Sequence, residues 1–290
     1  MLAAEVLQLL GRPETRLVVD CTLGLAGHAT DFLTRCPEAR LIGLDVDESN
    51  LKTAAEKLSP FGDRARLVRS NFAAVADVVA AQGWGRADAV LADLGVSSNQ
   101  IADPTRGLSF EVDAPLDMRL DSRLKTTAAD LVNTLSEGEL SDLLYFQSQE
   151  RHSRRISKRI CQARRQGRIN STVMLARLVA SAVGEDPDSH RHRIHPATRT
   201  FMALRMAVNR ETESLSALLT AVPSVLAPHG RVGIISFHSI EDRIVKEDFR
   251  GHAREGRYAL ITRKPVTAGD DECERNPRSR SAKLRVAEML

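Results

Sequence analysis

The sequence has 290 residues, of which 42% are hydrophobic and 27% charged, with a formal net charge of +3. This length is ample for a buried core, and the composition is ordinary for a globular protein. No apolar run approaches the roughly 18–20 residues of a membrane-spanning helix, and no signal-peptide pattern begins the sequence. The four cysteines are scattered without metal-ligand spacing, which predicts reduced thiols in a cytoplasmic protein: Cys21, Cys36, Cys161 and Cys273.

Strand and helix patterns alternate through the first third of the chain. Helical spacing covers residues 2–10, and apolar runs typical of strands follow at 16–20, 40–45, 66–70 and 87–94. Helical patterns separate these runs, with one ending near residue 36, one at 47–58 and one at 72–81. Such alternation predicts an α/β fold with a doubly wound, mostly parallel sheet.

This alternation stops after the fourth strand. Residues 95–124 are rich in turn formers, and helical patterns occupy 126–165, 172–183 and 196–226, with a polar loop at 185–193. Ser136, three residues before Glu139, predicts a capping box. Strand patterns return at 231–237, 258–263 and 283–287. We therefore expect a discontinuous sheet domain, 1–102 and 203–290, with a helical domain, 103–202, inserted in it.

Positive charge is concentrated in residues 151–168, RHSRRISKRICQARRQGR, which contain eight arginines or lysines and no acid. A solvated helix face usually mixes both signs, so a block of one sign predicts contact with a polyanion, RNA or DNA. The alternative is a basic surface helix without a partner. Arg151, Arg154 and Arg155 at the start of the block are candidate nucleic-acid contacts.

Residues 17–28, LVVDCTLGLAGH, combine a strand pattern, a glycine-containing turn and the start of a helix. Gly24 and Gly27 let backbone N–H groups approach a ligand, and a helix N-terminus favours negative charge. Asp45 ends the next strand, at the offset where an acid contacts the ribose of a bound nucleoside. The pattern predicts a nucleoside site, and a tight connection without a ligand is the alternative.

The turn GLAGHA lacks the GxGxxG spacing of dinucleotide sites. S-adenosylmethionine has an adenosine but no pyrophosphate, so a looser turn with a ribose acid favours it over a nicotinamide dinucleotide.

Asp93 follows the fourth strand and is expected at the same edge of the sheet. A carboxylate there can orient an exocyclic amine toward a methyl donor; the alternative is a buried aspartate that binds loop amides. His238 and Ser239 stand at the corresponding end of the fifth strand. A hydrolase is disfavoured because no GxSxG elbow surrounds Ser239.

Many separate motifs occur in one order along the chain. They include LIGLD ending at Asp45, DLGVSS from Asp93, RGLSF at 106–110, PLDMR at 115–119, HPATRTF at 195–201, SFHSIEDRIVK at 236–246 and NPRSRSAKLRVAE at 276–288. With them the chain resembles the bacterial 16S ribosomal RNA cytosine-N4 methyltransferases of the RsmH (MraW) type over almost its whole length.

This resemblance implies a class I S-adenosylmethionine-dependent methyltransferase with a Rossmann-like sheet and an inserted substrate-recognition domain. The implied reaction is methylation of N4 of a cytidine in the decoding (P-site) region of 16S rRNA in the small ribosomal subunit, with Asp93 as catalytic residue and no metal. Position by position, the implied cofactor contacts are Gly24, Ala26, Gly27, His28, Asp45, Phe72, Asp93 and Gln100.

Two departures from the family pattern stand out. The family usually has glycine where this chain has Ala26, which puts a methyl group near the expected cofactor. The family's His-x-Pro-Val segment, which usually precedes the residues matching 2–7, is not in this sequence.

Several questions stay open at this point. Arg119, Arg199, Arg205, Asn209 and His238, with Ser239, either contact RNA or hold the inserted domain. The protein is a monomer or a dimer. A DNA amino-methyltransferase and an RNA-binding ribosome-assembly factor with a decayed methyltransferase site are the alternative functions.

Overall fold

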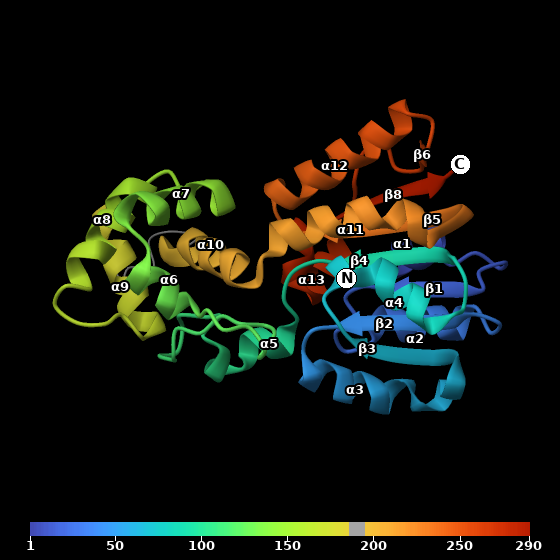
Figure 1. The fold of residues 1–290 in the computed structure, drawn as a ribbon, viewed down its shortest axis with the longest axis horizontal. Helices are drawn as coiled ribbons and strands as arrows, with labels where there is room; N and C mark the ends of the chain where they lie inside the picture. Colours follow the sequence, from blue (N-terminus) through green and yellow to red (C-terminus); the bar gives the residue numbers. More distant parts are fainter. Residues whose placement is uncertain (186–194) are drawn as a thin grey trace. The chain divides into compact units, whose positions relative to one another are not determined.

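The computed structural model describes residues 1–185 and 195–290, which form two compact units (Figure 1). The first unit comprises Met1–Gly95 and Thr212–Leu290, and the second comprises Val96–Glu211. The expected helical insertion, 103–202, falls within the second unit. The polar loop expected at 185–193 lies outside the described residues from position 186 onward.

A single sheet forms the centre of the first unit, with strand order β3-β2-β1-β4-β5-β8-β6 and β7 paired to β8. Strands β1 to β5 run parallel, whereas β8 runs antiparallel to β5 and β6. The predicted doubly wound, mostly parallel sheet is thereby confirmed. The strands are β1 (Leu17–Asp20), β2 (Arg40–Asp45), β3 (Ala65–Arg69), β4 (Ala87–Asp93), β5 (Leu226–Ser236), β6 (Tyr258–Leu260), β7 (Val266–Thr267) and β8 (Lys283–Met289).

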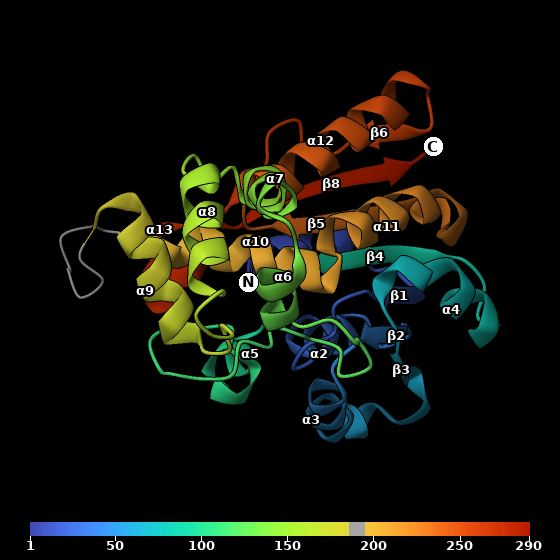
Figure 2. The ribbon, with the colours of Figure 1, turned by 60° about the vertical axis from the view of Figure 1, so that its left-hand side comes forward.

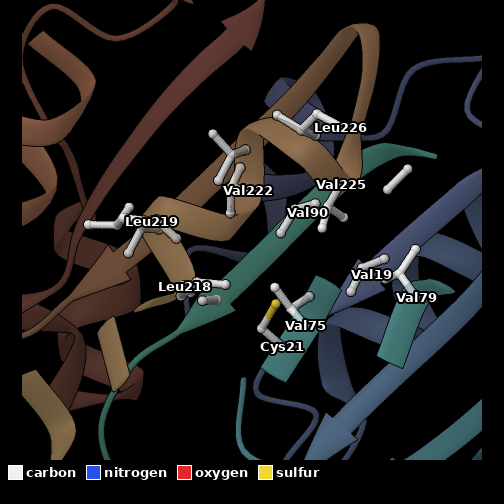
Figure 3. Close-up of a cluster of buried hydrophobic side chains, with 14 of the residues drawn as sticks. Val19, Cys21, Val75, Val79, Val90, Leu218, Leu219, Val222, Val225 and Leu226 are labelled. Atoms are coloured by element: carbon white, nitrogen blue, oxygen red, sulfur yellow. The ribbon is translucent and has the colours of Figure 1, made fainter. Parts of the chain in front are cut away.

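Helices cover both faces of this sheet, because successive side chains of a strand point to opposite faces. In β1, Val19 joins a buried cluster with α4 and α11, whereas Val18 joins a second cluster with α1 and α2. Figure 3 shows the first of these clusters. The helices of this unit are α1 (Ala3–Leu10), α2 (Gly27–Arg35), α3 (Glu48–Leu58), α4 (Val75–Gln82), α11 (Glu211–Val225, beginning at the border), α12 (Ser239–Arg254) and α13 (Asp270–Arg275).

The second unit is helical and has its own apolar core, in which Leu140, Leu144, Ile156 and Leu204 are fully buried. Within the described ranges its helices are α5 (Ser98–Ala102), α6 (Ala128–Thr134), α7 (Glu137–Ser148), α8 (Ser153–Ala163), α9 (Thr172–Val183) and α10 (Ala197–Asn209). The capping box predicted at Ser136 is present, because Ser136 and Glu139 each bind the other's backbone N–H.

The single long helix predicted at 196–226 is wrong, because Arg210, whose φ of 52° is left-handed, divides it into α10 and α11. The helical stretch at 126–165, with its predicted helix start at Ser136, forms α6, α7 and α8, and α7 ends at Gln149 with a φ of 55°. Apolar periodicity runs through such breaks because both flanking helices bury a face in the same core.

Strand boundaries also differ in places. Strand β5 begins at Leu226 rather than residue 231, and β7 was not predicted. Across the described ranges, no helix is both long and apolar enough to cross a bilayer.

Gly43 of β2 supports the turn after β1, because a Cβ at this position would lie 2.7 Å from Leu23 Cδ1. We expect Gly43→Val to lower the free energy of unfolding by about 1–3 kcal/mol through overpacking. Denaturant unfolding measures the loss. Gly251→Ala in α12 is the control, since a Cβ there meets no atom within 4 Å; it should stabilise by about 0.4–1 kcal/mol. Equal effects of both substitutions would contradict this account.

Candidate functional site

Three parallel strands of the first unit end in an aspartate at the same edge of the sheet: β1 at Asp20, β2 at Asp45 and β4 at Asp93. Since β1 lies between β2 and β4, the three carboxylates stand on adjacent strands. Open α/β sheets bind their ligands outside the carboxyl ends of the strands. We call Asp20, Asp45 and Asp93 the acidic edge.

The turn after β1 is tied to β2 by backbone bonds. Leu23 N–H donates to Leu44 O at 2.8 Å, and Gly24 N–H donates to Asp45 Oδ2 at 2.8 Å. Helix α2 begins at Gly27, close to the predicted start. A Cβ at Gly27 would meet no atom within 4 Å, so there is open space beside this backbone.

Ala26 keeps the backbone conformation that glycine favours, with φ 56° and ψ 36°. A non-glycine residue in this region costs roughly 1–2 kcal/mol. Its side chain is fully buried in the apolar cluster that includes Leu23 and Phe32. The extra methyl group therefore packs into the core beneath the turn.

Asp45 accepts three hydrogen bonds that join the turn to helix α3. Besides Gly24, Asp47 N–H donates to Oδ1 at 2.8 Å and Asn50 Nδ2 donates to Oδ2 at 3.2 Å. Burial raises the pKa of Asp45, and these hydrogen bonds act against that rise. Asp47 caps α3 by accepting from Ser49 N–H. Asp45 Oδ2 accepts two of the three bonds and Oδ1 only one, so Oδ1 retains acceptor capacity for a hydroxyl group.

Asp93 and His28 face one another, with Asp93 Oδ2 3.6 Å from His28 Nε2. The backbone N–H of Asp93 donates to Thr22 Oγ1 at 2.6 Å. Within the described part of the chain, Asp93 Oδ1 and His28 Nδ1 are buried atoms without a hydrogen-bond partner. Unpaired buried polar atoms are costly, so these two are suited to a ligand that supplies the missing partners.

Asp20 is the member of the acidic edge that the sequence-based site omitted. It is 2% exposed and accepts a hydrogen bond from Thr22 N–H at 3.1 Å. Burial raises the pKa of Asp20 to about 6; His28 and the Thr22 hydrogen bond lower it, whereas Asp93 and Asp45 raise it. Its position at the end of β1, equivalent to that of Asp45 on β2, was the signal that could have identified it.

At the end of β5, His238 and Ser239 have structural contacts. His238 Nδ1 accepts from Glu241 N–H at 3.4 Å as the cap of α12, and Ser239 is the first residue of that helix. His238 Nε2 lies 3.2 Å from Glu241 Oε1, and the next carboxylate of the helix, Asp242, pairs with Arg285 at 2.6 Å. These contacts give no hydrolase pair, as the missing elbow motif had indicated.

Phe72 and Gln100 belong to different units. Phe72 follows β3 and packs, partly buried, against the core of the first unit. Gln100 lies in α5 of the second unit, where its Oε1 accepts from Ser97 N–H at 3.0 Å. Cofactor contact by either residue stays a prediction.

Arg119, Arg205 and Asn209 are bonded within the second unit. Arg119 pairs with Asp117 through two contacts of 2.7 Å, and Arg205 pairs with Glu211 through two of 2.8 Å. Asn209 accepts from Leu120 N–H and donates to the carbonyl oxygens of Met118 and Arg205. These contacts lie within the second unit, and RNA contact by these three residues stays a prediction.

The other candidate substrate contacts are exposed in the second unit: Arg151 in the turn before α8, Arg154 and Arg155 in the first turn of α8, and Arg199 in α10. Among the described residues, no group of three or more His, Cys, Asp or Glu side chains could hold a metal ion.

The strand order β3-β2-β1-β4-β5, with the helical insertion α6–α10, defines the fold as that of a class I S-adenosylmethionine-dependent methyltransferase. More narrowly, the chain belongs to the MraW methylase family, whose model matches residues 1–290.

Among its relatives is the ribosomal RNA small subunit methyltransferase H of Sorangium cellulosum (strain So ce56), 47% identical over 100% of this chain and 90% of the relative. Proteins of the same name from Geobacter sp. (strain M21) and Synechococcus sp. (strain CC9605) are 46% and 50% identical. They match 100% and 94% of this chain, and 97% and 90% of their own lengths.

The raised pKa of Asp20 predicts a specific pH dependence of stability. An acid whose pKa is higher in the folded state binds protons more tightly there, so its contribution to stability falls as pH rises through its unfolded and folded pKa values. Asp20→Asn retains the acceptor for Thr22 but cannot ionise. Relative to wild type, the variant should gain on the order of 2–3 kcal/mol between about pH 4 and pH 7. Denaturant unfolding across that range measures the difference, and a pH-independent difference would refute the assignment.

Proposed function

We propose that the protein transfers a methyl group from S-adenosylmethionine to N4 of a cytidine in the decoding region of 16S rRNA. Support comes from membership of the MraW methylase family and from full-length relatives named ribosomal RNA small subunit methyltransferase H. The choice of cytosine as the methylated base and of N4 as the methylated atom rests on the motifs of the RsmH (MraW) type. These motifs include the strand ends that carry Asp45 and Asp93. Because this substrate is ribosomal RNA, the proposal assigns the protein to the cytoplasm.

The acidic edge is the observation that carries the cofactor assignment. No lysine or arginine of the described residues forms an ion pair with Asp20, Asp45 or Asp93. The cations beside Asp93 are the N-terminal ammonium of Met1, 3.6 Å from Oδ2, and His28 when it is protonated. Such an edge disfavours the pyrophosphate of a dinucleotide. It suits S-adenosylmethionine, which carries a positive sulfonium and an amino group.

The residues present fit this cofactor. Asp45 has acceptor capacity for ribose hydroxyls, and the open space beside Gly27 lets a ligand approach the backbone. We assign the adenine region to Phe72 and further contacts to Gly24, Ala26, His28 and Gln100. No metal enters the proposal.

Asp93 has the catalytic role in this proposal. S-adenosylmethionine, when bound, supplies a methyl group already activated by its sulfonium. The exocyclic N4 of cytosine is a weak nucleophile because its lone pair is delocalised into the ring. Asp93 Oδ1, which lacks a partner, accepts a hydrogen bond from N4 and holds the amine in the orientation for attack. A cytosine within a stack must first be splayed out to become accessible.

The basic side chains at the start of α8, Arg154 and Arg155, are proposed to hold the RNA backbone together with Arg151, which precedes the helix; Arg199 is a further candidate. Binding through phosphate contacts weakens steeply as salt is added.

The test is transfer of labelled methyl groups from S-adenosylmethionine to small ribosomal subunits, with the modified nucleotide located by mass spectrometry. We expect wild type to methylate N4 of one cytidine of 16S rRNA. Asp93→Asn at saturating cofactor should lower the rate by at least about a hundredfold, because its uncharged amide oxygen accepts a weaker hydrogen bond from N4 than the carboxylate does. The control is Asp77→Asn, an exposed carboxylate in the first turn of α4, which should retain full rate.

Full activity of Asp93→Asn would remove the catalytic assignment. Transfer to duplex DNA but not to small subunits would show that the substrate is DNA and not ribosomal RNA. Failure of wild type to bind S-adenosylmethionine in calorimetry would favour an assembly factor without transferase activity.

A further inference from the structure

Two aromatic side chains are exposed side by side at the C-terminal end of α7. Tyr145 is 53% exposed and Phe146 is 69% exposed, and their rings meet edge to face with centroids 5.4 Å apart. The opposite face of α7 buries Leu140 and Leu144 in the core. Adjacent exposed rings are not required for folding, and contiguous apolar exposure marks interaction sites.

Helix α8 presents a basic face. Ile156 and Ile160 face the core, whereas Arg154, Arg155, Lys158 and Arg159 are exposed at spacings that place them on one side of the helix. No hydrogen bond or ion pair within residues 1–185 and 195–290 involves the side chains of these four cations. By contrast, Arg164 of the same block donates to the carbonyl oxygens of Val132 and Leu135, and Arg168 pairs with Asp130.

The basic face carries an uncompensated cost. Arg154–Lys158 and Arg155–Arg159 are like-charged pairs at i,i+4, and each such pair destabilises a helix. No acid occurs between residues 151 and 168 to offset them. A polyanion bound to this face supplies the missing negative charge.

The aromatic pair and the basic face are neighbours. Helices α7 and α8 lie side by side in both views (Figures 1 and 2). Ser141, one turn before Tyr145, contacts Ser153 at the start of α8 with their Oγ atoms 3.2 Å apart. The exposed acids of α7, Glu137, Glu139 and Asp142, all precede the aromatic pair.

We propose that this surface, which we call the α7/α8 platform, binds an unpaired RNA segment. It consists of Tyr145, Phe146, Arg151 and the basic face of α8. Bases stack on the two rings while the cations contact the flanking phosphates, the combination by which proteins hold single strands. The proposal rests on the RNA substrate proposed above and adds a subsite that selects unstacked bases. A paired helix offers phosphates to the cations but no free base faces to the rings.

The test uses the full-length protein and a fluorescein-labelled single-stranded RNA of mixed sequence, with binding followed by fluorescence anisotropy over a range of salt. The double substitution Tyr145→Leu with Phe146→Leu keeps apolar bulk but removes the aromatic faces. It should weaken binding about 5- to 150-fold, with the salt dependence unchanged, because stacking and not charge is lost. A double substitution Arg154→Gln with Arg155→Gln should also weaken binding, but it should reduce the dependence of log K on log salt by about 0.7 per lost phosphate contact.

Val112→Ala, at a 61% exposed apolar side chain of the second unit, is the matched control and should bind RNA as wild type does. Weakening by the Leu substitutions on single-stranded RNA, without weakening on the same RNA annealed to its complement, supports the platform.

Unchanged single-strand affinity of the Leu variant overturns the proposal. So does a change in oligomeric state without a change in RNA affinity, since the rings then contact a second copy. Methyl transfer to small subunits by wild type is measured in parallel. If wild type transfers methyl groups while the Leu variant binds RNA normally, the platform proposal is wrong and the proposed function stands. If wild type transfers no methyl group, the proposed function is wrong, whatever the RNA affinity of the Leu variant.

Discussion

The hydrogen bond from Gly24 N–H to Asp45 Oδ2 connects the turn after β1 with the acidic edge, the two parts of the candidate site. It holds the turn after β1 against the end of β2, and the other oxygen of Asp45 holds the start of α3 through Asp47 N–H. The same carboxylate thus fixes the shape of the turn and remains able to accept from a ligand. Ala26 fits this arrangement because its methyl group is buried in the core and does not occupy the open side of the turn. Its left-handed backbone lowers the stability of the fold without blocking the approach of a ligand.

Convergence of Asp20, Asp45 and Asp93 on one edge concentrates negative charge in a partly buried place. Burial and mutual repulsion disfavour the charged form of Asp20, and the site leaves Asp93 Oδ1 without a partner. Both features are costs for the unliganded protein. A ligand with positive charge and hydrogen-bond donors offsets both, which is the physical basis of the proposed preference for S-adenosylmethionine.

Much of this could be predicted from the sequence, because alternating strand and helix patterns dictate a parallel sheet and parallel strands bring their carboxyl ends together. Asp45 and Asp93 followed from that rule. Asp20 obeys it equally, but its role depends on burial, which the sequence does not display. The breaks at Gln149 and Arg210 could not be predicted, since left-handed backbone at residues other than glycine leaves no compositional signal. Two partners of Asn209, Met118 and Leu120, likewise depend on contacts between segments far apart in the chain.

The central claim is that the acidic edge binds the cationic methyl donor. Calorimetric titration with S-adenosylmethionine near the raised pKa of Asp20, in two buffers of different ionisation enthalpy, measures the protons exchanged on binding. A bound cation lowers the pKa of Asp20, so wild type should release protons, and Asp20→Asn should bind with much smaller release. Binding without proton release by wild type, or with equal release by both proteins, would contradict the account.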